Sequence, residues 1–184
     1  MAQDTTRYGE DIYGKSMLPE LLTALCEIDG FKWIRTLYCY PERITDELLD
    51  VIAKEDKLVK YLDMPIQHCD KNILKRMNRH GDRETLTALI KKIREKIPNV
   101  TLRTTLITGF PGETKEQFEE LCEFVKEIRF ERLGCFAYSP EEGTPAEKFE
   151  DQVPLKDRER RAEIIMEEQM IISDSFNEAA LDSE

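Results

Sequence analysis

Short strand-like runs alternate with amphipathic helical segments along this 184-residue chain, and this alternation constrains the fold more than any other feature. Four runs rich in β-branched or aromatic residues, each closed by Pro, Gly or Ser, cover residues 33–38, 61–64, 100–107 and 133–138. Strands that alternate with helices form right-handed β–α–β crossovers and a parallel sheet. The sequence therefore predicts an α/β fold, and the alternation leaves open whether the sheet is flat or curved into a barrel.

Apolar residues at helical spacing predict six helices between and after these runs. The segments lie near residues 18–28, 48–52, 73–77, 86–97, 118–128 and 155–176. Ser16 and Thr45 are candidate N-caps, the short third helix follows Asp70, and Thr114 followed by Gln117 fits a capping box. On the last helix the expected apolar side consists of Ala162, Ile165, Met166, Met170 and Ile172.

Composition and charge exclude several classes of protein. No apolar run approaches the roughly 18 residues that span a bilayer, and the N-terminus lacks the features of a signal peptide, so we expect a cytoplasmic protein with no membrane partner. The net charge of −11 argues against direct binding of nucleic acid. Residues 141–184 carry 14 acidic and 5 basic side chains. This acidic end is either a solvated helix face or a surface that attracts a basic protein.

Cysteine spacing and charged strand residues give further constraints. The five cysteines are an odd number and no two lie within four residues of each other, which argues against a disulfide framework or a compact zinc site. Arg103 shares a predicted strand face with Thr105 and Ile107, where a sheet covered on both faces would bury the guanidinium at high cost. Arg103, Asp63 and Arg35 therefore indicate either a barrel mouth that holds a charged ligand or a structural ion network.

Three segments could carry chemistry at the ends of strands, where parallel α/β folds bind ligands. In residues 108–114, two glycines permit a tight turn and a close approach to a ligand, and Glu113 could accept hydrogen bonds or merely cap the helix. Gln67 offers both a donor and an acceptor after the strand at 61–64. His68 beside Cys69 is a weak pattern for a metal or thiol site, because neighbours on a strand point to opposite faces. Tyr138 and Ser139 could meet a purine or simply form a turn.

Taken together, these segments resemble the radical S-adenosylmethionine (SAM) methylthiotransferases. The matching blocks, in order, are AQDTTRYG (2–9), WIRTLYCYP (33–41), YLDMPIQHCDKNILKRMNR (61–79), LRTTLITGFPGET (102–114) and YSPEEGTPA (138–146). The resemblance extends to about residue 172. Within the family, the first two blocks most resemble the branch that modifies an aspartate of a small-subunit ribosomal protein, and the alternative is the branch that modifies tRNA.

The resemblance implies a partial (β/α) TIM-like barrel of the radical SAM type, lacking its first strand, in residues 1–152, and an acidic C-terminal helix and tail in residues 153–184. It implies cofactor-binding residues at the strand ends, with Gln3 and Asp4 near the SAM amino group, Gln67 facing the ribose and Arg103 reaching the carboxylate. The resemblance also places four residues beside the adenine and methionine parts of SAM: Ile107, Gly109, Gly112 and Glu113. At the end of the sixth strand of the family barrel it places Tyr138 and Ser139.

One departure from the family changes what is expected of this polypeptide. The parent enzyme uses SAM and iron–sulfur clusters to transfer a methylthio group to the β-carbon of an aspartate in a basic ribosomal protein. The family's C-x3-C-x2-C cluster motif does not occur in these 184 residues. We therefore expect no catalytic or metal-binding residue here and no activity of this chain in isolation, with a non-catalytic binding module as the alternative. An open barrel edge would favour a dimer.

Overall fold

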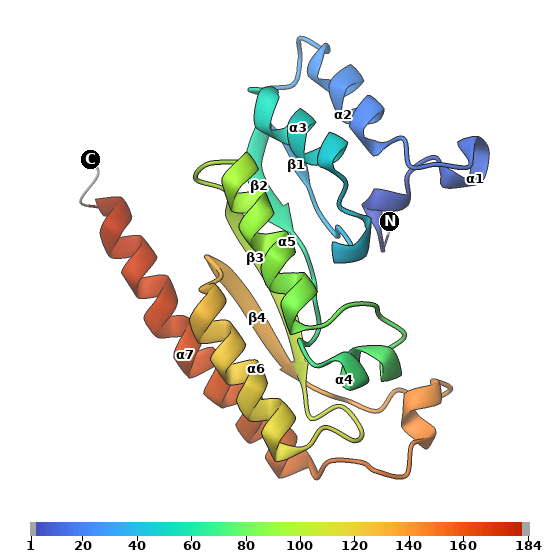
Figure 1. Cartoon of the computed structure of the whole chain (residues 1–184), viewed down its shortest axis with the longest axis vertical. Coiled ribbons are helices and arrows are strands. Elements are labelled where there is room, and N and C mark those ends of the chain that lie inside the picture. The colour runs from blue at the N-terminus through green and yellow to red at the C-terminus, as the bar shows by residue number, and fades with distance from the viewer. Residues whose placement is uncertain (1–2, 182–184) are drawn as a thin grey trace. The chain divides into compact units, whose positions relative to one another are not determined.

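The computed structural model describes residues 3–181 and has a parallel α/β architecture (Figure 1). Its contacts divide the chain into two compact units. The first runs up to Pro65 and includes Thr87–Arg103, and the second consists of Ile66–Leu86 and the residues from Thr104 onward. The strand order is β1-β2-β3-β4. Strand β3 (Thr101–Thr108) begins in the first unit and ends in the second.

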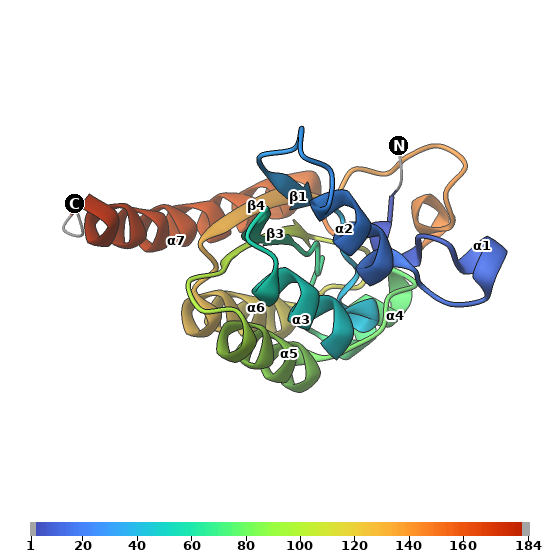
Figure 2. The same ribbon diagram turned by 90° about the horizontal axis from the view of Figure 1, so that it is seen from above.

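In the first unit, β1 (Ile34–Thr36) and β2 (Leu58–Asp63) pair in parallel, and β2 pairs in parallel with the start of β3. Helix α3 (Asp46–Lys54) packs on β2 and on α2 (Leu18–Cys26), and Figure 2 shows α3 near α2. The Thr45 side chain caps α3 by accepting from the backbone N–H of Leu48, as predicted. The shorter elements of this unit are η1 (Thr5–Arg7), α1 (Glu10–Tyr13) and η2 (Pro41–Arg43), and α5 (Arg83–Lys96) ends here.

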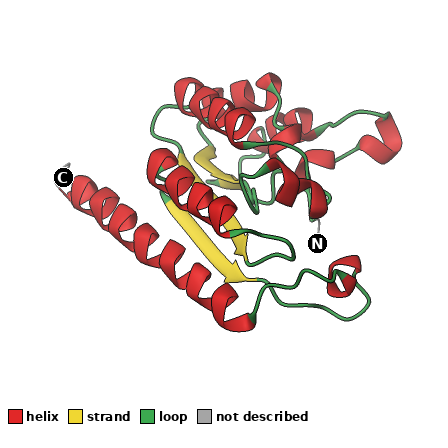
Figure 3. Ribbon diagram, turned by 60° about the horizontal axis from the view of Figure 1, so that its bottom comes forward, coloured by secondary structure: helices red, strands yellow, loops and turns green. Residues whose placement is uncertain are grey.

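The second unit contains α4 (Lys71–Arg76), the end of β3, α6 (Lys115–Ile128), β4 (Arg132–Ala137), η3 (Pro145–Lys148) and α7 (Leu155–Leu181). Asp70 caps α4, and the predicted capping box opens α6, since Thr114 accepts from the N–H of Gln117 while the Gln117 side chain accepts from the N–H of Thr114. Helix α7 runs along β4 and contacts α6 (Figure 3). The two segments that hold candidate site residues before α4 and before α6 are therefore each followed by a capped helix.

Strand β3 alternates strictly between buried and partly exposed residues. Leu102, Thr104 and Leu106 are fully buried, whereas Arg103 lies on the other face, as the sequence predicted. Each unit buries its own apolar side chains, with Leu48, Leu49, Ile52, Leu58 and Leu62 in the first and Leu121, Phe124, Phe130, Ile165 and Ile172 in the second. One face of β3 is buried in the core, so a candidate site residue such as Arg103 lies on the opposite face.

The predicted apolar side of the last helix was wrong at two positions, at the first of which Met166 is 40% exposed. Met170 is 62% exposed, and Gln169 is buried in its place at 2% exposure. The Gln169 amide nitrogen donates to the backbone carbonyl of Phe130 at 2.9 Å and to Ser173 Oγ at 2.9 Å. These two hydrogen bonds replace the ones that this nitrogen would make to water if it were exposed. Among residues 3–181, none of the helices has the length and apolar content needed to cross a bilayer.

Candidate functional site

An ion pair joins two strand residues in the first unit. Arg103 on β3 donates from Nη1 to Asp63 Oδ1 on β2 at 2.8 Å, and the two residues are direct neighbours in the strand register. The Asp63 side chain is 3% exposed and that of Arg103 is 34% exposed. The hydrogen bond that Arg103 donates to Asp63 raises the pKa of Arg103. The sequence left open whether the charged strand residues pair with one another, and Asp63 and Arg103 do so. The guanidinium of Arg103 keeps an accessible edge.

The segment that contains Gln3 and Asp4 lies beside the end of β1. Thr5 donates from its backbone N–H to the carbonyl of Tyr38 at 3.0 Å, and the N–H of Tyr38 donates to Asp63 Oδ2 at 3.2 Å. Asp4 caps η1 through the N–H of Thr6, and its Oδ2 lies 3.6 Å from Arg43 Nε. Gln3 is exposed. Asp4 and Arg103 are thus linked through Tyr38 and Asp63 within one unit.

In the second unit, two of the predicted site residues each have a buried polar side-chain atom without a hydrogen-bond partner among the described residues. Gln67 occupies the left-handed region at φ 69° and bridges Leu106 of β3, donating to the Thr105 carbonyl and accepting from the Ile107 N–H, both at 2.9 Å. Its Oε1 atom and the Tyr138 hydroxyl are buried without a hydrogen-bond partner among the described residues. Buried polar atoms are nearly always paired, so these two atoms fit a bound polar ligand such as SAM.

Glu113 is the most constrained of the predicted residues. Its side chain is fully buried, its Oε2 accepts from the N–H of Gly109 at 2.8 Å, and its Oε1 accepts from Arg161 Nη1 of α7 at 2.6 Å. Arg161 also donates to the Glu113 carbonyl at 3.0 Å. His68 Nε2 lies 3.6 Å from Glu113 Oε2, and its Nδ1 accepts from the Asp70 N–H. This carboxylate therefore fixes the 109–113 turn through contacts within the chain.

The two glycines of the turn have positive φ angles of 68° and 84°, and both make room for neighbouring protein atoms. A Cβ on Gly109 would lie 2.1 Å from Arg158 Cγ, and one on Gly112 would lie 2.6 Å from Asp151 Oδ2. The close approach predicted for a ligand is thus made here by α7 and by the segment before it. Among the remaining candidates, Ile107 and Tyr138 join an apolar cluster with Phe110, whereas Ser139 is exposed.

All five cysteines are free thiols. Burial raises the pKa of Cys39, Cys69 and Cys135 to about 12 and that of Cys122 to about 11. Thiolates, not thiols, ligate metals and attack as nucleophiles. Within residues 3–181, no group of three His, Cys, Asp or Glu side chains is placed to hold a metal ion. These thiols do not fit an iron–sulfur cluster, and the high pKa of Cys69 also argues against thiol catalysis beside His68.

The raised thiol pKa values predict slow alkylation of the native chain. At pH 8 we expect Cys39 and Cys69, both fully buried, to react with iodoacetamide about a thousandfold more slowly than a free cysteine, since a pKa of about 12 instead of 9.0 leaves that much less thiolate. Raising the pH should accelerate both reactions. Mass spectrometry of timed samples measures the rates, and a urea-unfolded sample, in which all five thiols should react alike, is the control. Native-state modification of Cys39 as fast as that of the partly exposed Cys26 would contradict the prediction.

The sequence model of the radical SAM superfamily matches residues 8–125, well over half of the chain. The chain belongs to the radical SAM superfamily. The match includes the Asp63–Arg103 pair and the turn that Glu113 fixes. Membership confirms the resemblance that the sequence blocks indicated.

Among radical SAM proteins, the chain is similar to curated methylthiotransferases. It is 57% identical to the ribosomal protein uS12 methylthiotransferase RimO of Lachnoclostridium phytofermentans over 94% of this chain and 39% of that protein. It is 51% identical to RimO of Clostridioides difficile over 97% of this chain and 40% of that protein. The chain thus spans about 40% of the length of these relatives.

Solved radical SAM structures confirm the fold. The chain resembles coproporphyrinogen III oxidase (HemN) of Escherichia coli with a TM-score of 0.63 at 24% identity, over 85% of this chain and 36% of that one. It resembles the methyltransferase TsrM of Kitasatospora setae with a TM-score of 0.51 at 16% identity, over 69% of this chain and 24% of that one. The sheet is therefore part of a radical SAM (β/α) barrel, which answers the question that alternation alone left open.

Sequence reasoning missed the contribution of α7 to this region. Arg158 donates to the Tyr138 carbonyl at 2.8 Å, and its own carbonyl accepts from Thr108 Oγ1 at 3.3 Å. Arg161 holds Glu113. The two arginines stand three residues apart and therefore share one helix face, but many exposed helices have basic residues at that spacing. No signal in the sequence distinguishes these two from Arg160, which pairs with Glu163 and Glu167 on the surface.

Proposed function

We propose that this chain forms part of the catalytic barrel of an enzyme that transfers a methylthio group to the β-carbon of an aspartate in ribosomal protein uS12, in the cytoplasm. The observation that carries the proposal is 51–57% identity to RimO proteins over 91–97% of the chain. When bound together with a reduced iron–sulfur cluster, SAM supplies a radical that can remove a hydrogen atom from an unactivated carbon. The role of this chain is to bind and orient SAM.

The strand ends would hold SAM through groups that can still form hydrogen bonds. Gln67 Oε1 and the Tyr138 hydroxyl are buried atoms without a partner among the described residues, and they suit the ribose and the adenine. Arg103 would bind the carboxylate with its accessible edge while Asp63 holds its orientation. The remaining proposed contacts come from Gln3, Asp4, Ile107 and Ser139, whereas Gly109 and Gly112 are approached by protein atoms and would act by shaping the turn. For Glu113, we propose an indirect role through the turn that it fixes.

The charge of the chain favours a protein substrate over tRNA. A net charge of −11 repels the phosphate backbone of tRNA and attracts a basic ribosomal protein. We also propose that the 184-residue polypeptide does not cleave SAM by itself, because its thiols are scattered, largely buried and protonated. Modification of tRNA is the second candidate function.

A chimeric enzyme tests the proposal. Residues 1–172 of this chain would replace the matching segment of RimO from Lachnoclostridium phytofermentans. We expect the chimera to add a methylthio group to uS12, detected by mass spectrometry of the purified ribosomal protein, because the segment supplies equivalent SAM contacts. Arg103→Gln and Gln67→Ala in the chimera should each reduce product at least about tenfold, the loss expected when a buried or charged hydrogen bond is removed.

Two further measurements serve as controls for the chimera. Trp33→Ala, at a side chain that is 80% exposed and outside the proposed contacts, should leave the product yield unchanged. Nucleoside analysis of tRNA from the same cells tests the second candidate function. Thiolated tRNA together with unmodified uS12 would contradict the proposed substrate.

A further inference from the structure

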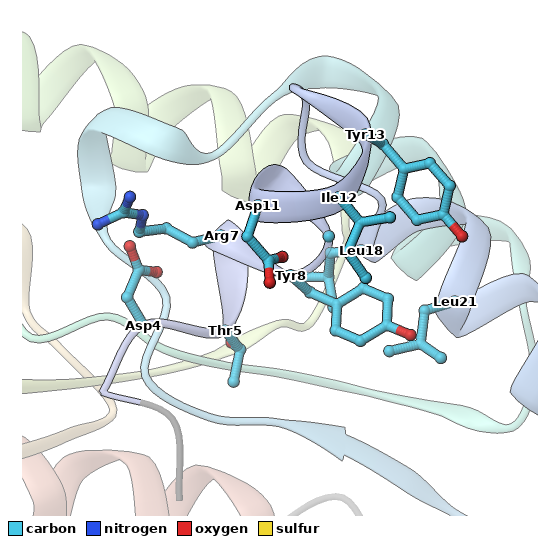
Figure 4. Close-up of a pocket in the computed structure, with 10 residues that line it drawn as sticks. Asp4, Thr5, Arg7, Tyr8, Asp11, Ile12, Tyr13, Leu18 and Leu21 are labelled. Atoms are coloured by element: carbon cyan, nitrogen blue, oxygen red, sulfur yellow. The ribbon is translucent and has the colours of Figure 1, made fainter.

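A hollow in the first unit combines aromatic walls with an acidic side chain. It has a volume of about 510 Å³ and is lined mostly by apolar surface from Tyr8, Ile12, Tyr13, Leu18 and Leu21. Figure 4 shows the carboxylate of Asp11 beside Tyr8 in this hollow. Tyr8, Ile12 and Tyr13 are 49%, 74% and 62% exposed. Three large side chains within six residues that face solvent together mark a surface prepared for a partner.

The loop around the hollow is held in place by the chain itself. Gly9, at φ 82°, turns the backbone tightly against Met17, where a Cβ would lie 2.8 Å from Met17 Cγ. The Met17 N–H donates to the Tyr8 carbonyl at 2.7 Å, and Glu10 forms ion pairs with both Arg7 and Arg43. The tyrosine rings are therefore displayed on a fixed turn.

The charges around the hollow indicate what it binds. Glu10 is neutralised by Arg7 and Arg43, and Asp4 lies 3.6 Å from Arg43. Asp11 has no ion pair within residues 3–181, so its negative charge remains available to a ligand. Figure 4 shows Arg7 pointing away from the tyrosines, toward the side where Asp4 lies. The hollow thus combines apolar walls with one uncompensated carboxylate.

We propose that this hollow docks an arginine side chain of the basic protein substrate. An arginine has an apolar stem for the walls formed by Ile12 and the leucines, a planar guanidinium that stacks on tyrosine rings, and a positive charge for Asp11. A lysine fits less well because its compact ammonium does not stack. The inference rests on the proposed function for the identity of the partner, and on the hollow alone for the chemistry of the ligand.

The position of the hollow agrees with a docking role. Thr5, which lines the hollow, donates to the Tyr38 carbonyl, and the N–H of Tyr38 donates to Asp63, the partner of Arg103. The docked arginine would therefore sit next to the strand ends to which we assign SAM contacts in this unit. A substrate held here at one side chain would present neighbouring residues to those strand ends.

The first test measures the affinity of the 184-residue chain for purified uS12 by fluorescence anisotropy. We expect Asp11→Asn to weaken binding about fivefold and the double variant Tyr8→Ala/Tyr13→Ala about tenfold, the size expected for an exposed ion pair and for cation–π contacts. Both variants alter exposed side chains, so folding should be retained. Asp29→Asn and Trp33→Ala, exposed in the same unit but outside the hollow, are matched controls that should bind like the wild type.

The second test replaces the substrate by a defined probe. An octapeptide of alternating Gly and Arg should shift the ring resonances of Tyr8 and Tyr13 in NMR spectra, and the corresponding Gly–Glu peptide should not. If uS12 binds and the hollow variants bind it within twofold of the wild type, the inference is overturned while the proposed function stands. If the arginine peptide shifts the ring resonances of Tyr8 and Tyr13 but uS12 does not, arginine binding by the hollow is supported and uS12 is contradicted as its partner. If neither ligand shifts them, the inference is overturned.

Discussion

Arg161→Met is expected to lower the free energy of unfolding by about 3–5 kcal/mol, because it leaves the buried carboxylate of Glu113 without its charged partner. Glu113 has no exposed side-chain surface, and the Arg161 side chain is only 16% exposed. Methionine keeps most of the apolar stem, so the loss reflects charge and hydrogen bonding more than volume. Urea unfolding followed by circular dichroism measures the change.

The neighbouring residue provides a matched control for this substitution. Arg160→Met makes the same chemical change one position earlier on α7, where the arginine pairs with Glu163 and Glu167 at side-chain exposures above half. We expect a loss below about 0.5 kcal/mol there, as for exposed ion pairs generally. The double variant Glu113→Gln/Arg161→Met should lose less than the sum of its single variants. Equal losses for Arg160→Met and Arg161→Met would show that Glu113 does not depend on Arg161.

The parts of the fold that local physics determines could be predicted from the sequence. The alternation of strands and helices predicted the parallel sheet, and Thr45 and Thr114 cap their helices as predicted, because a cap depends on residues three or fewer positions apart. Element ends were less accurate. Strand β2 begins at Leu58 rather than Tyr61, since its pairing with β1 extends past the most apolar residues.

The surroundings of the candidate site could be predicted only in part. Residues at strand ends were found because a parallel sheet places them at one edge. The partners of those residues were not found, since the contact between Glu113 and Arg161 spans 48 positions along the chain and leaves no local pattern. Gly109 and Gly112 indicated that another group comes close to the backbone of this turn. The sequence does not show which group that is, and the two glycines were therefore assigned to ligand binding. The structure identifies helix α7 as the approaching group at Gly109.

Gly109→Ala is therefore expected to be severely destabilising, by about 4 kcal/mol, through two additive causes. At φ 68° an alanine adopts a strained backbone conformation, and its Cβ would lie 2.9 Å from the backbone Cα of Arg158 as well as against the side chain of that residue. A flexible side chain could move aside, but the backbone of α7 could not without breaking the bond from Thr108 Oγ1 to the Arg158 carbonyl.

Gly143→Ala separates the two causes. Gly143 has a φ of 82°, and nothing lies within 4 Å of a Cβ added there, so this variant carries the conformational strain alone and should lose about 1–2 kcal/mol. Thermal and urea unfolding of both variants measure the difference, which we assign to packing of α7 on the 109–113 turn. If the two variants lost the same stability, α7 would not hold that turn. Gly109 would then be required for its backbone angle alone, and the space above it would again be available to a ligand.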